Sequence, residues 1–293
     1  MVGISTRHCN KNVEQMIASD IDVIVAIGPN EKKAHVEQAL ISLAQDGFEG
    51  KIRVYCCVDG NEDGEVLAYL RSLDSETFRV FVNEKNQGLA HSLNRLIDRI
   101  LDESSAEFVA RMDADDISMP DRFKKQVSYL QENPSISVLG SWLVEFDELE
   151  ETEYLKKLAT NSKNLEQWLF WRCPLNHPTV VFRRHVFENG YRYRSDLKMS
   201  QDYELWIRLV LDGYKIGNIP VPLLRFRRQQ NFLNKRSYRK SWLEFKFKIR
   251  FLLERRQYYL TGYALSFARL LIGTLPHPVL KRLYRVSRIR MGH

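Results

Sequence analysis

The stretch FVARMDADD occupies residues 108–116 and joins a short apolar run to three carboxylates. A short apolar run bounded by polar residues is typical of a strand that is buried on both faces. Three similar runs come earlier, at residues 21–27 (IDVIVAI), 52–58 (IRVYCCV) and 78–82 (FRVFV). Segments with helical spacing separate these runs. The alternation predicts an α/β fold, with a mostly parallel sheet and helices on both of its faces.

The predicted helices repeat apolar residues every three or four positions, which is the period of a helix face that packs on a sheet. Polar residues that directly follow the strands lie at the carboxyl edge of such a sheet, where ligands bind. Asp59 and the cluster 113–116 are in this position. The helix prediction rests on Val36, Leu40, Leu43, Leu89, Leu93, Leu96, Ile100, Phe123, Val127 and Leu130.

The second half of the chain is less regular. Residues 138–146 (VLGSWLVEF) and 179–182 (TVVF) are strand-like, whereas residues 164–171 (NLEQWLFW) and 202–211 (DYELWIRLVL) are helix-like. These patterns continue the α/β prediction, but they do not fix how the later strands join the sheet.

Composition and length exclude several classes of protein. The chain has 293 residues, of which 44% are hydrophobic and 28% charged, which indicates a globular protein and not a disordered or fibrous one. The four cysteines include no CxxC pair, which argues against a disulfide framework or a structural zinc site and favours a reducing compartment. We predict no secretory signal and no simple membrane span, because residues 1–20 lack an apolar core and no run of about 18 apolar residues occurs.

The charge is distributed unevenly along the chain. Residues 225–293 contain 18 Lys and Arg against two acids, a net charge of +16, so the first 224 residues carry −9 of the total of +7. Residues 242–251 (WLEFKFKIRF) interleave aromatic and basic side chains, a composition that suits the surface of an anionic bilayer. Two alternatives are that these helices simply close over the rest of the chain, or that they bind nucleic acid, for which no recognisable motif is present.

The carboxylates at 113–116 have a chemical and a structural interpretation. Their mutual repulsion is offset if a cation binds, and carboxylate oxygens next to substrate phosphates suit Mg²⁺ or Mn²⁺. Alternatively, the cluster is a solvated turn in which Asp116 caps the helix that follows. The acidic run 59–64 (DGNEDG) also matches the first half of a calcium loop, but Leu70 stands where the bidentate glutamate is required, which excludes calcium.

A third acidic feature is SQDYELW at residues 200–206. Ser200 is a candidate N-cap, and an aspartate in the first turn of a helix is favoured by the helix dipole, so Asp202 has a purely structural explanation. The alternative is that Asp202 is a general base, which requires a carboxylate in a cleft within reach of a hydroxyl.

Together these motifs resemble the family-2 glycosyltransferases, enzymes of the GT-A fold that transfer a sugar from a nucleotide-sugar to an acceptor hydroxyl. The strongest match is RMDADDISMPDRF at residues 111–123, and NEKNQGLA at 83–90 precedes it. Gly140-Ser141, NHPT at 176–179 and QDYELWIRL at 201–209 continue the match in the same order, over about residues 20–230. The pattern is similar to the bacterial branch of the family that builds O-antigen, capsule or exopolysaccharide.

The resemblance implies a role for each matched residue. Asp59 would bind the nucleobase or ribose of a UDP-sugar, and Asp113 and Asp115 would hold the ribose and a Mn²⁺ or Mg²⁺ ion on the diphosphate. Asp202 would be the catalytic base of an inverting hexosyltransferase. Further contacts with the donor are expected from Gly28, Asn86, Gly88, Arg111 and Arg225, and contacts with the acceptor from His177 and Trp206.

The sequence departs from the family pattern in three places. Residues 28–31 (GPNE) replace a Pro-x-Tyr-Asn segment beside the nucleobase, and Gln201 replaces the first residue of a Glu-Asp dyad. Residues 224–227 (LRFR) replace a Tyr-Arg-x-His pattern. Because that histidine is absent, Arg227 or Arg228 is expected to serve the phosphates instead.

The expected organisation is a leader segment (1–20), a Rossmann-like GT-A catalytic domain (21–230) and a basic amphipathic helical tail (231–293). The nucleotide-sugar half of the domain would span 21–118 and the acceptor half 119–230. We expect a cytoplasmic enzyme, bound to the cytoplasmic face of the inner membrane through 232–293, that acts on a saccharide on a polyprenyl-diphosphate lipid and binds no nucleic acid. Two other functions are a sugar-phosphate nucleotidyltransferase, for which GPNEKK (28–33) is a poor phosphate loop, and a non-catalytic basic nucleic-acid-binding module.

Overall fold

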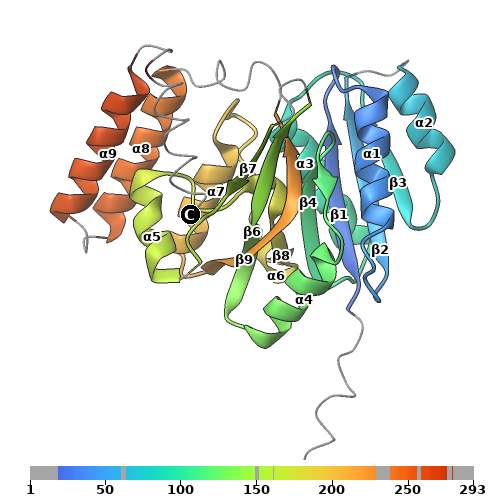
Figure 1. Ribbon diagram of the computed structural model, residues 1–293, viewed down its shortest axis with the longest axis horizontal. Helices are drawn as coiled ribbons and strands as arrows, with labels where there is room; N and C mark the ends of the chain where they lie inside the picture. Colours follow the sequence, from blue (N-terminus) through green and yellow to red (C-terminus); the bar gives the residue numbers. More distant parts are fainter. Residues whose placement is uncertain are drawn as a thin grey trace, which may run out of the picture.

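Four parallel strands form the first half of the sheet, as the sequence predicts (Figure 1). They lie in the order β3-β2-β1-β4, so the two central strands, β1 and β2, are flanked by strands that come later in the chain. Their bounds are β1 Ile21–Ile27, β2 Ile52–Asp59, β3 Phe78–Asn83 and β4 Phe108–Asp113. The computed structural model describes residues 19–60, 64–148, 152–160, 162–228, 238–255, 259–275 and 279.

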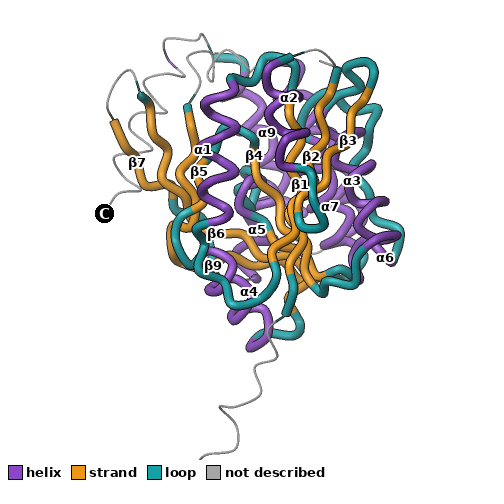
Figure 2. The backbone as a smooth tube through the Cα atoms, turned by 90° about the vertical axis from the view of Figure 1, so that its right-hand side faces the viewer, coloured by secondary structure: helices purple, strands orange, loops and turns teal. Residues whose placement is uncertain are grey.

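Helices cover both faces of these strands, as the tube view also shows (Figure 2). The strand side chains alternate between two hydrophobic cores. Ile24 of β1 packs into the core that contains α3, whereas its neighbours Val23 and Val25 pack into the core that contains α1, α2 and α4. The helices are α1 Lys33–Ala44, α2 Glu65–Leu73, α3 Leu89–Glu103 and α4 Arg122–Glu132. The apolar positions that predict α1, α3 and α4 are buried, apart from Leu89.

The second half of the sheet is mixed. Strand β8 joins β4 in an antiparallel pair, and β6 and β9 form a long parallel pair beyond it. The short strand β5, directly after the 113–116 cluster, pairs with the end of β9, so that Arg225 lies opposite Ile117. The bounds of these strands are β5 Ile117–Ser118, β6 Ile136–Asp147, β7 Thr152–Lys156, β8 Val181–Arg183 and β9 Lys215–Arg227.

The C-terminal helices pack against α5 and α7 (Figure 1). Arg255 of α8 donates to the carbonyl of Val210 in α7 at 2.6 Å, and Ser266 of α9 donates to the carbonyl of Phe170 in α5 at 3.4 Å. Helices α8 and α9 lie so close that a Cβ on Gly262 would be 2.3 Å from Leu252. The remaining helices are α5 Ser162–Trp171, the 3₁₀ turn η1 His177–Thr179, α6 His185–Glu188, α7 Gln201–Leu211, α8 Tyr238–Arg255 and α9 Tyr259–Gly273.

Several sequence predictions concern the ends of the chain and its cysteines. Most of the leader (1–18) and the boundary at 229–237 lie outside the described residues, as does the basic stretch 280–293. None of the described helices combines the length and the apolar character that crossing a bilayer requires. The described cysteines Cys56, Cys57 and Cys173 are free thiols.

Candidate active site

A cavity of about 370 Å³ opens at the carboxyl ends of β1, β2 and β4. The loops after these strands form its wall together with the start of α3 and the end of β9. Six of the residues that the sequence predicts for the donor line this one cavity, namely Gly28, Asp59, Asn86, Gly88, Asp113 and Asp115. The rule that ligands bind at the carboxyl edge of such a sheet therefore points to an actual cavity.

Asp59 holds the loop that precedes α3. Its carboxylate accepts hydrogen bonds from the backbone N–H groups of Gln87 at 2.9 Å and Gly88 at 2.7 Å, and from Nδ2 of Asn83 at 2.9 Å. The loop passes very close to Gly60, where a Cβ would lie 2.4 Å from the backbone nitrogen of Asn86. The aspartate is thus a buried anchor that shapes the cavity wall and contributes a carboxylate to it.

The three carboxylates of the 113–116 cluster differ in how far they are exposed to solvent. Asp113 is the most accessible, with 30% of its side chain exposed, whereas Asp115 is 8% exposed and Asp116 is completely buried. Burial raises the pKa of Asp116 well above its ordinary value, and the negative charges of Asp113 and Asp115 raise it further. The interpretation of this cluster as a solvated turn is wrong, because Asp116 is buried and the N-cap of α4 is Asp121.

Arg227, near the end of β9, closes the cavity over this cluster. Its backbone N–H donates to Asp116 at 3.0 Å, and its Nε donates to the carbonyl of Asp115 at 2.8 Å. Its Nη2 donates to Gln38 of α1 at 2.7 Å, and the guanidinium is 4% exposed. Arg227 therefore adds a fixed positive charge to the cavity wall.

Arg225 lies elsewhere, although it is two residues before Arg227 on the same strand. Its guanidinium pairs with Glu153 and lies 4.7 Å from the centre of the Phe146 ring, and it is not among the residues that line the cavity. The predicted donor contact at Arg225 therefore finds no support in this placement. Arg227, one of the two arginines expected to serve the phosphates in place of the absent histidine, does line the cavity.

Arg111 stands behind Asp113 on strand β4. Its guanidinium is 2% exposed and pairs through Nη2 with Oδ1 of Asp113. Its Nε and Nη1 have no hydrogen-bond partner among the described residues. Arg111 thus orients Asp113 and places a buried positive charge beneath the carboxylate cluster.

The cavity has the donor set that a divalent cation prefers when phosphates complete its coordination. Among the described residues, no group of three or more His, Cys, Asp or Glu side chains could enclose an ion. Mg²⁺ and related ions are typically bound by one or two carboxylates, with substrate phosphates and water as the other ligands. Asp113 and Asp115 line the cavity and fit this pattern. Burial is the main cause of the raised pKa of Asp116, and the charges of these two carboxylates raise it further, a repulsion that a cation would offset.

His177 and Tyr193 form a hydrogen-bonded pair beside Arg111. The Nε2 atom of His177 is 2.9 Å from the Tyr193 hydroxyl; the residue as a whole is partly exposed, and burial lowers the pKa of its imidazole well below the usual value. Burial raises the pKa of Tyr193; the charge of Arg111 lowers it, and the charges of Asp202 and Asp113 raise it. The charges of Asp113, in the cavity, and of Asp202, the predicted base, therefore both influence the Tyr193 hydroxyl.

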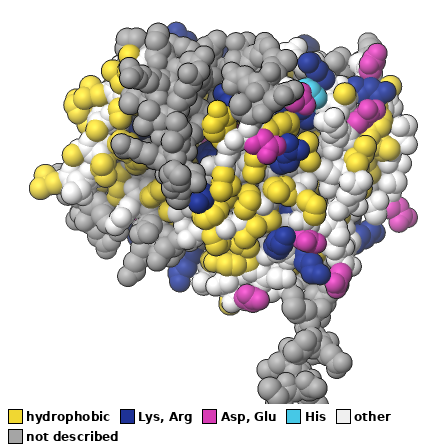
Figure 3. Space-filling model, in the orientation of Figure 1, with side chains coloured by type: hydrophobic (Ala, Val, Ile, Leu, Met, Phe, Trp, Pro, Cys, Tyr) yellow, Lys and Arg dark blue, Asp and Glu magenta, His cyan; other side chains and the backbone are white. Residues whose placement is uncertain are grey.

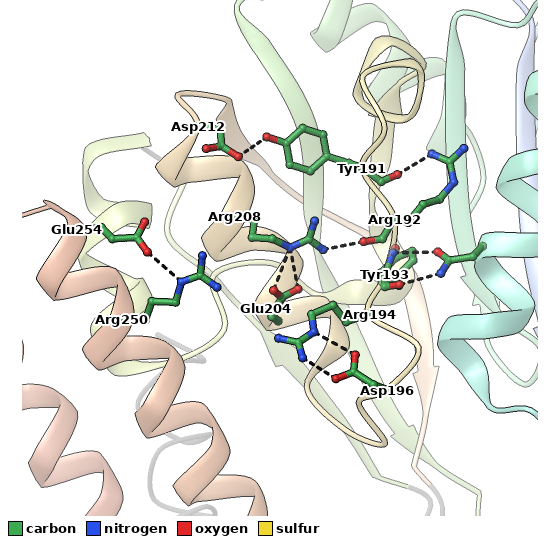
Figure 4. A network of polar contacts seen from close by, with 11 residues as sticks. Tyr191, Arg192, Tyr193, Arg194, Asp196, Glu204, Arg208, Asp212, Arg250 and Glu254 are labelled. Carbon is green, nitrogen blue, oxygen red and sulfur yellow. Dashed lines mark hydrogen bonds and ion pairs between the residues drawn. The ribbon is translucent and has the colours of Figure 1, made fainter.

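The segment 191–196 that carries Tyr193 is fixed on both sides (Figure 4). The backbone N–H and carbonyl of Tyr193 bond to the amide side chain of Asn94 in α3, at 2.9 and 2.7 Å. Arg208 of α7 donates to the carbonyl of Arg192 at 2.6 Å and is itself paired with Glu204. This loop therefore links the helix behind the donor cavity to the helix that carries Asp202.

Asp202 lies in the first turn of α7 and outside the donor cavity. Its side chain is partly exposed, and its Oδ2 accepts a hydrogen bond from the thiol of Cys173 at 3.6 Å. Ser200 occupies the N-cap position, as predicted, but makes no capping bond with its side chain. Its hydroxyl donates instead to Oε1 of Glu244 in α8, at 3.1 Å.

Trp206 does not lie where an acceptor could contact it. Its side chain is completely buried, stacks on Phe182 with ring centres 5.6 Å apart, and meets the edge of His177 at 6.2 Å. The predicted acceptor contact at Trp206 is therefore corrected to a supporting role beneath His177. Sequence reasoning did not single out Tyr193 or Glu244, because neither follows a strand or carries a motif.

Residues 24–190, more than half of the chain, match the family model described as "Glycosyl transferase family 2". The chain belongs to glycosyltransferase family 2. The amylovoran biosynthesis glycosyltransferase AmsE of Erwinia amylovora is 30% identical over 276 residues, which cover 91% of this chain and 98% of that protein. Membership of family 2 makes the chain a transferase of sugars and confirms the predicted family.

Two more distant comparisons bear on the fold and the relatives. The UDP-Gal:alpha-D-GlcNAc-diphosphoundecaprenol beta-1,3-galactosyltransferase of Escherichia coli is 27% identical over 56% of this chain and 60% of that protein. The mannosyltransferase PcManGT of Pyrobaculum calidifontis, in complex with GDP-Man and Mn²⁺, superposes with a TM-score of 0.59 at 15% identity. That superposition covers 94% of this family-2 chain and 81% of PcManGT, and it confirms the predicted GT-A fold.

Proposed function

We propose that the chain is an inverting, metal-dependent hexosyltransferase that moves a sugar from a UDP-sugar to a hydroxyl of a saccharide on a polyprenyl-diphosphate lipid. The proposal includes a place in bacterial surface polysaccharide biosynthesis. One observation carries it. The cavity gathers Asp59, Asp113 and Asp115, while Asp202 lies outside it, near enough to Tyr193 for its charge, like that of Asp113, to add to the burial that raises the pKa of this hydroxyl.

Relatives support the finer parts of this proposal. The E. coli relative is named for a UDP-sugar donor and a diphosphoundecaprenol acceptor, and the E. amylovora relative for polysaccharide biosynthesis. The Pyrobaculum neighbour holds Mn²⁺ with its nucleotide-sugar. We extend these properties to this chain because carboxylates that suit a nucleotide-sugar donor and its metal line the cavity.

On the donor side, the nucleoside lies along Gly28, Asp59 and Gly88, and the diphosphate faces Asp113 and Asp115. Bound Mn²⁺ or Mg²⁺ would offset the charge that develops on the departing UDP. Arg111 keeps Asp113 oriented, and the Arg227 guanidinium adds a positive charge on the same wall. Groups fixed in advance in this way stabilise developing charge without having to reorganise during the reaction.

On the acceptor side, Asp202 takes the proton of the acceptor hydroxyl while that oxygen attacks the anomeric carbon. The bond from this carbon to the diphosphate breaks, and UDP leaves with the electron pair. A base on the face opposite the leaving group inverts the configuration in one displacement. His177, partly exposed beside Tyr193, is the nearby group that we assign to acceptor contact.

Helices α8 and α9 supply a surface for the membrane on which a lipid-linked acceptor resides. The outer face of α9 exposes 81% of Leu260 and 54% of Phe267, and hydrophobic side chains gather at this edge of the molecule (Figure 3). On α8, Lys246 lies 5.8 Å from the ring centre of the exposed Trp242, and Arg250 is also exposed. Apolar side chains next to cations fit an anionic bilayer surface, on the cytoplasmic face of the inner membrane.

Nucleotide release tests the reaction. Purified chain is incubated with UDP-, GDP- or dTDP-sugars, a polyprenyl-diphosphate-linked saccharide, and Mn²⁺, Mg²⁺ or EDTA. We expect release of UDP from a UDP-sugar only when the metal is present, and a product of inverted anomeric configuration by NMR. Equal activity in EDTA, a retained configuration, or release of pyrophosphate from a nucleoside triphosphate contradicts the proposal.

Vesicle sedimentation tests the membrane surface. We expect the chain to bind vesicles that contain phosphatidylglycerol and not vesicles of phosphatidylcholine alone. Leu260→Asp combined with Phe267→Asp should lower binding by about 100-fold or more, because each buried side chain contributes about 1.5–3 kcal/mol. Ile41→Asp, at an apolar position on α1 whose exposure of 51% is close to that of Phe267, is the control and should bind as the wild type does. Unchanged binding of the double variant rejects this surface.

A further inference from the structure

One face of α8 reaches the part of the site that carries Asp202. Glu244 of α8 accepts a hydrogen bond of 3.1 Å from the hydroxyl of Ser200, the residue directly before α7. One turn later, Lys248 is 2% exposed and donates to the carbonyl of Trp171, at the end of α5, at 3.3 Å. After another turn, the ring of Phe251 lies 5.5 Å from that of Phe170. Helix α8 therefore contacts both α5 and the start of α7.

The backbone in front of Asp202 is held in an unfavourable conformation. Ser200 has φ 59° and ψ 27°, in the left-handed region. Among the described residues, the only other non-glycine residue with positive φ is Asp121. A left-handed non-glycine residue costs about 1–2 kcal/mol and persists only where surrounding contacts enforce it. Its side chain does not cap α7, and within the described part of the chain its hydroxyl bonds to Glu244.

We propose that Glu244 is a positioning residue for the transfer reaction. By holding Ser200 in the left-handed turn, it fixes the direction in which Asp202 leaves the first turn of α7. This inference rests on the proposed function, because it takes Asp202 as the base. A misplacement of about 1 Å in a reacting group lowers a rate by about 100-fold, so a single bond two residues away has a measurable effect.

Glu244 also has a purely structural explanation, which the test must separate. It lies one turn before the buried Lys248. The pKa of Lys248 is lowered to about 8, mainly by burial, and the negative charge of Glu244 opposes this shift. It also lies 3.9 Å from Lys240. If Glu244 only compensates these cations, its removal destabilises α8 without a specific effect on the chemical step. A positioning role instead lowers kcat and leaves the affinity for the donor unchanged.

The experiment measures kcat, the KM for UDP-sugar and thermal stability in Glu244→Ala, Ser200→Ala and the double variant. We expect each single variant to lose about 10- to 100-fold in kcat with an unchanged donor KM, and the double variant to lose no more than the singles. Glu244→Gln keeps an acceptor oxygen and should recover most of the activity. Glu254→Ala, on the exposed face of the same helix and paired with Arg250, is the matched control and should keep wild-type kcat.

Ser200→Gly guards against a loss of fold, because glycine adopts the left-handed conformation without strain. We expect it to be as stable as the wild type and as slow as Ser200→Ala. A wild-type kcat in Glu244→Ala or in Ser200→Gly, or additive losses in the double variant, overturns the inference. Asp202→Asn measured beside them separates the two proposals, since wild-type transfer in that variant removes the proposed function itself.

Discussion

The donor side and the acceptor side of this site are held by different kinds of contact. Asp59 ends β2 and Asp113 ends β4, the two strands that flank β1 in one parallel sheet, so strand register alone brings them to one edge. Asp202 begins a helix whose first turn is held by Glu244, 44 residues beyond Ser200 in the chain. The comparison teaches that the proposed donor carboxylates are placed by the core fold, whereas the start of the helix that carries the proposed base contacts the C-terminal extension.

The two sides also differ in the sign of the charge that they bury. The donor side concentrates carboxylates and compensates them with Arg111 and Arg227, which are 2% and 4% exposed. The acceptor side buries the cation of Lys248 against α5 and α7. Substitutions on each side should therefore fail in different ways, and the predictions below start with the largest effect.

Asp113→Asn should cause the largest loss among the donor-side variants, because it removes a carboxylate on which the proposed metal depends. We expect the rate of transfer to fall by about 1,000-fold, which corresponds to about 4 kcal/mol of lost charge stabilisation. Titration of UDP with and without Mn²⁺ should show that the metal no longer strengthens binding. Asp98→Asn, at a side chain that is 60% exposed, is the control and should transfer normally. Metal-stimulated binding that survives in Asp113→Asn would contradict the donor assignment.

Arg227→Gln and Arg225→Gln compare two positions on one strand. Loss of the buried Arg227 should lower the free energy of unfolding by about 3 kcal/mol, since it leaves buried negative charge uncompensated, and should raise the donor KM. Loss of Arg225, whose side chain is 39% exposed, should change the unfolding free energy by less than about 1 kcal/mol and leave the donor KM unchanged. Urea unfolding and steady-state kinetics measure both. A higher donor KM in Arg225→Gln would restore the prediction made from sequence.

Asp46→Asn tests a buried carboxylate outside the donor cavity, at the start of α4. Asp46 is 1% exposed and accepts the backbone N–H of Phe123 at 3.1 Å, and burial raises its pKa to about 6. Because the folded pKa lies above the unfolded value of 3.8, the group favours folding below about pH 4 and loses that contribution as pH rises through 6. The variant should be about 2 kcal/mol more stable than the wild type at pH 7 and equally stable near pH 4. A constant difference across this range contradicts the prediction.

Lys248→Met tests the buried cation on the acceptor side. Burial lowers the pKa of Lys248 to about 8 from 10.5, so the folded state disfavours the protonated amine. Stability should rise as pH increases from about 8 to 10.5, where the unfolded chain still binds the proton. The variant should gain about 1–2 kcal/mol at pH 7, after loss of the bond to Trp171, and this gain should shrink to zero or below by about pH 10.5. Calorimetry at both pH values measures it, and a gain that does not change with pH argues against a charged Lys248.

The donor cavity could be predicted from the sequence because its information is local. Each strand is a short apolar run, and the residue that follows it necessarily lies at the sheet edge, which places Asp59, Asp113 and Asp115. Strand β9 was not predicted, because Pro220 and Pro222 argue against a strand. The structure accommodates the prolines where the register with β6 shifts, between Ser141 and Trp142.

The rest of the site depends on contacts that no local pattern encodes. Arg225 and Arg227 are two residues apart on β9, yet only the tertiary structure separates the exposed one from the one in the cavity. Trp206 shares a motif with Asp202, but its side chain points into the core. The contact between Glu244 and Ser200 requires α8 to pack on α7, which the composition of the tail does not reveal.

Paired measurements on Asp202→Asn test the separation of donor and acceptor roles most directly. The affinity for UDP with Mn²⁺ and the single-turnover rate of transfer are determined on one preparation. The account predicts wild-type affinity for the nucleotide and a transfer rate that is lower by about 100- to 10,000-fold, the range for loss of a general base. Wild-type transfer in Asp202→Asn, or loss of nucleotide affinity in step with the rate, would contradict it.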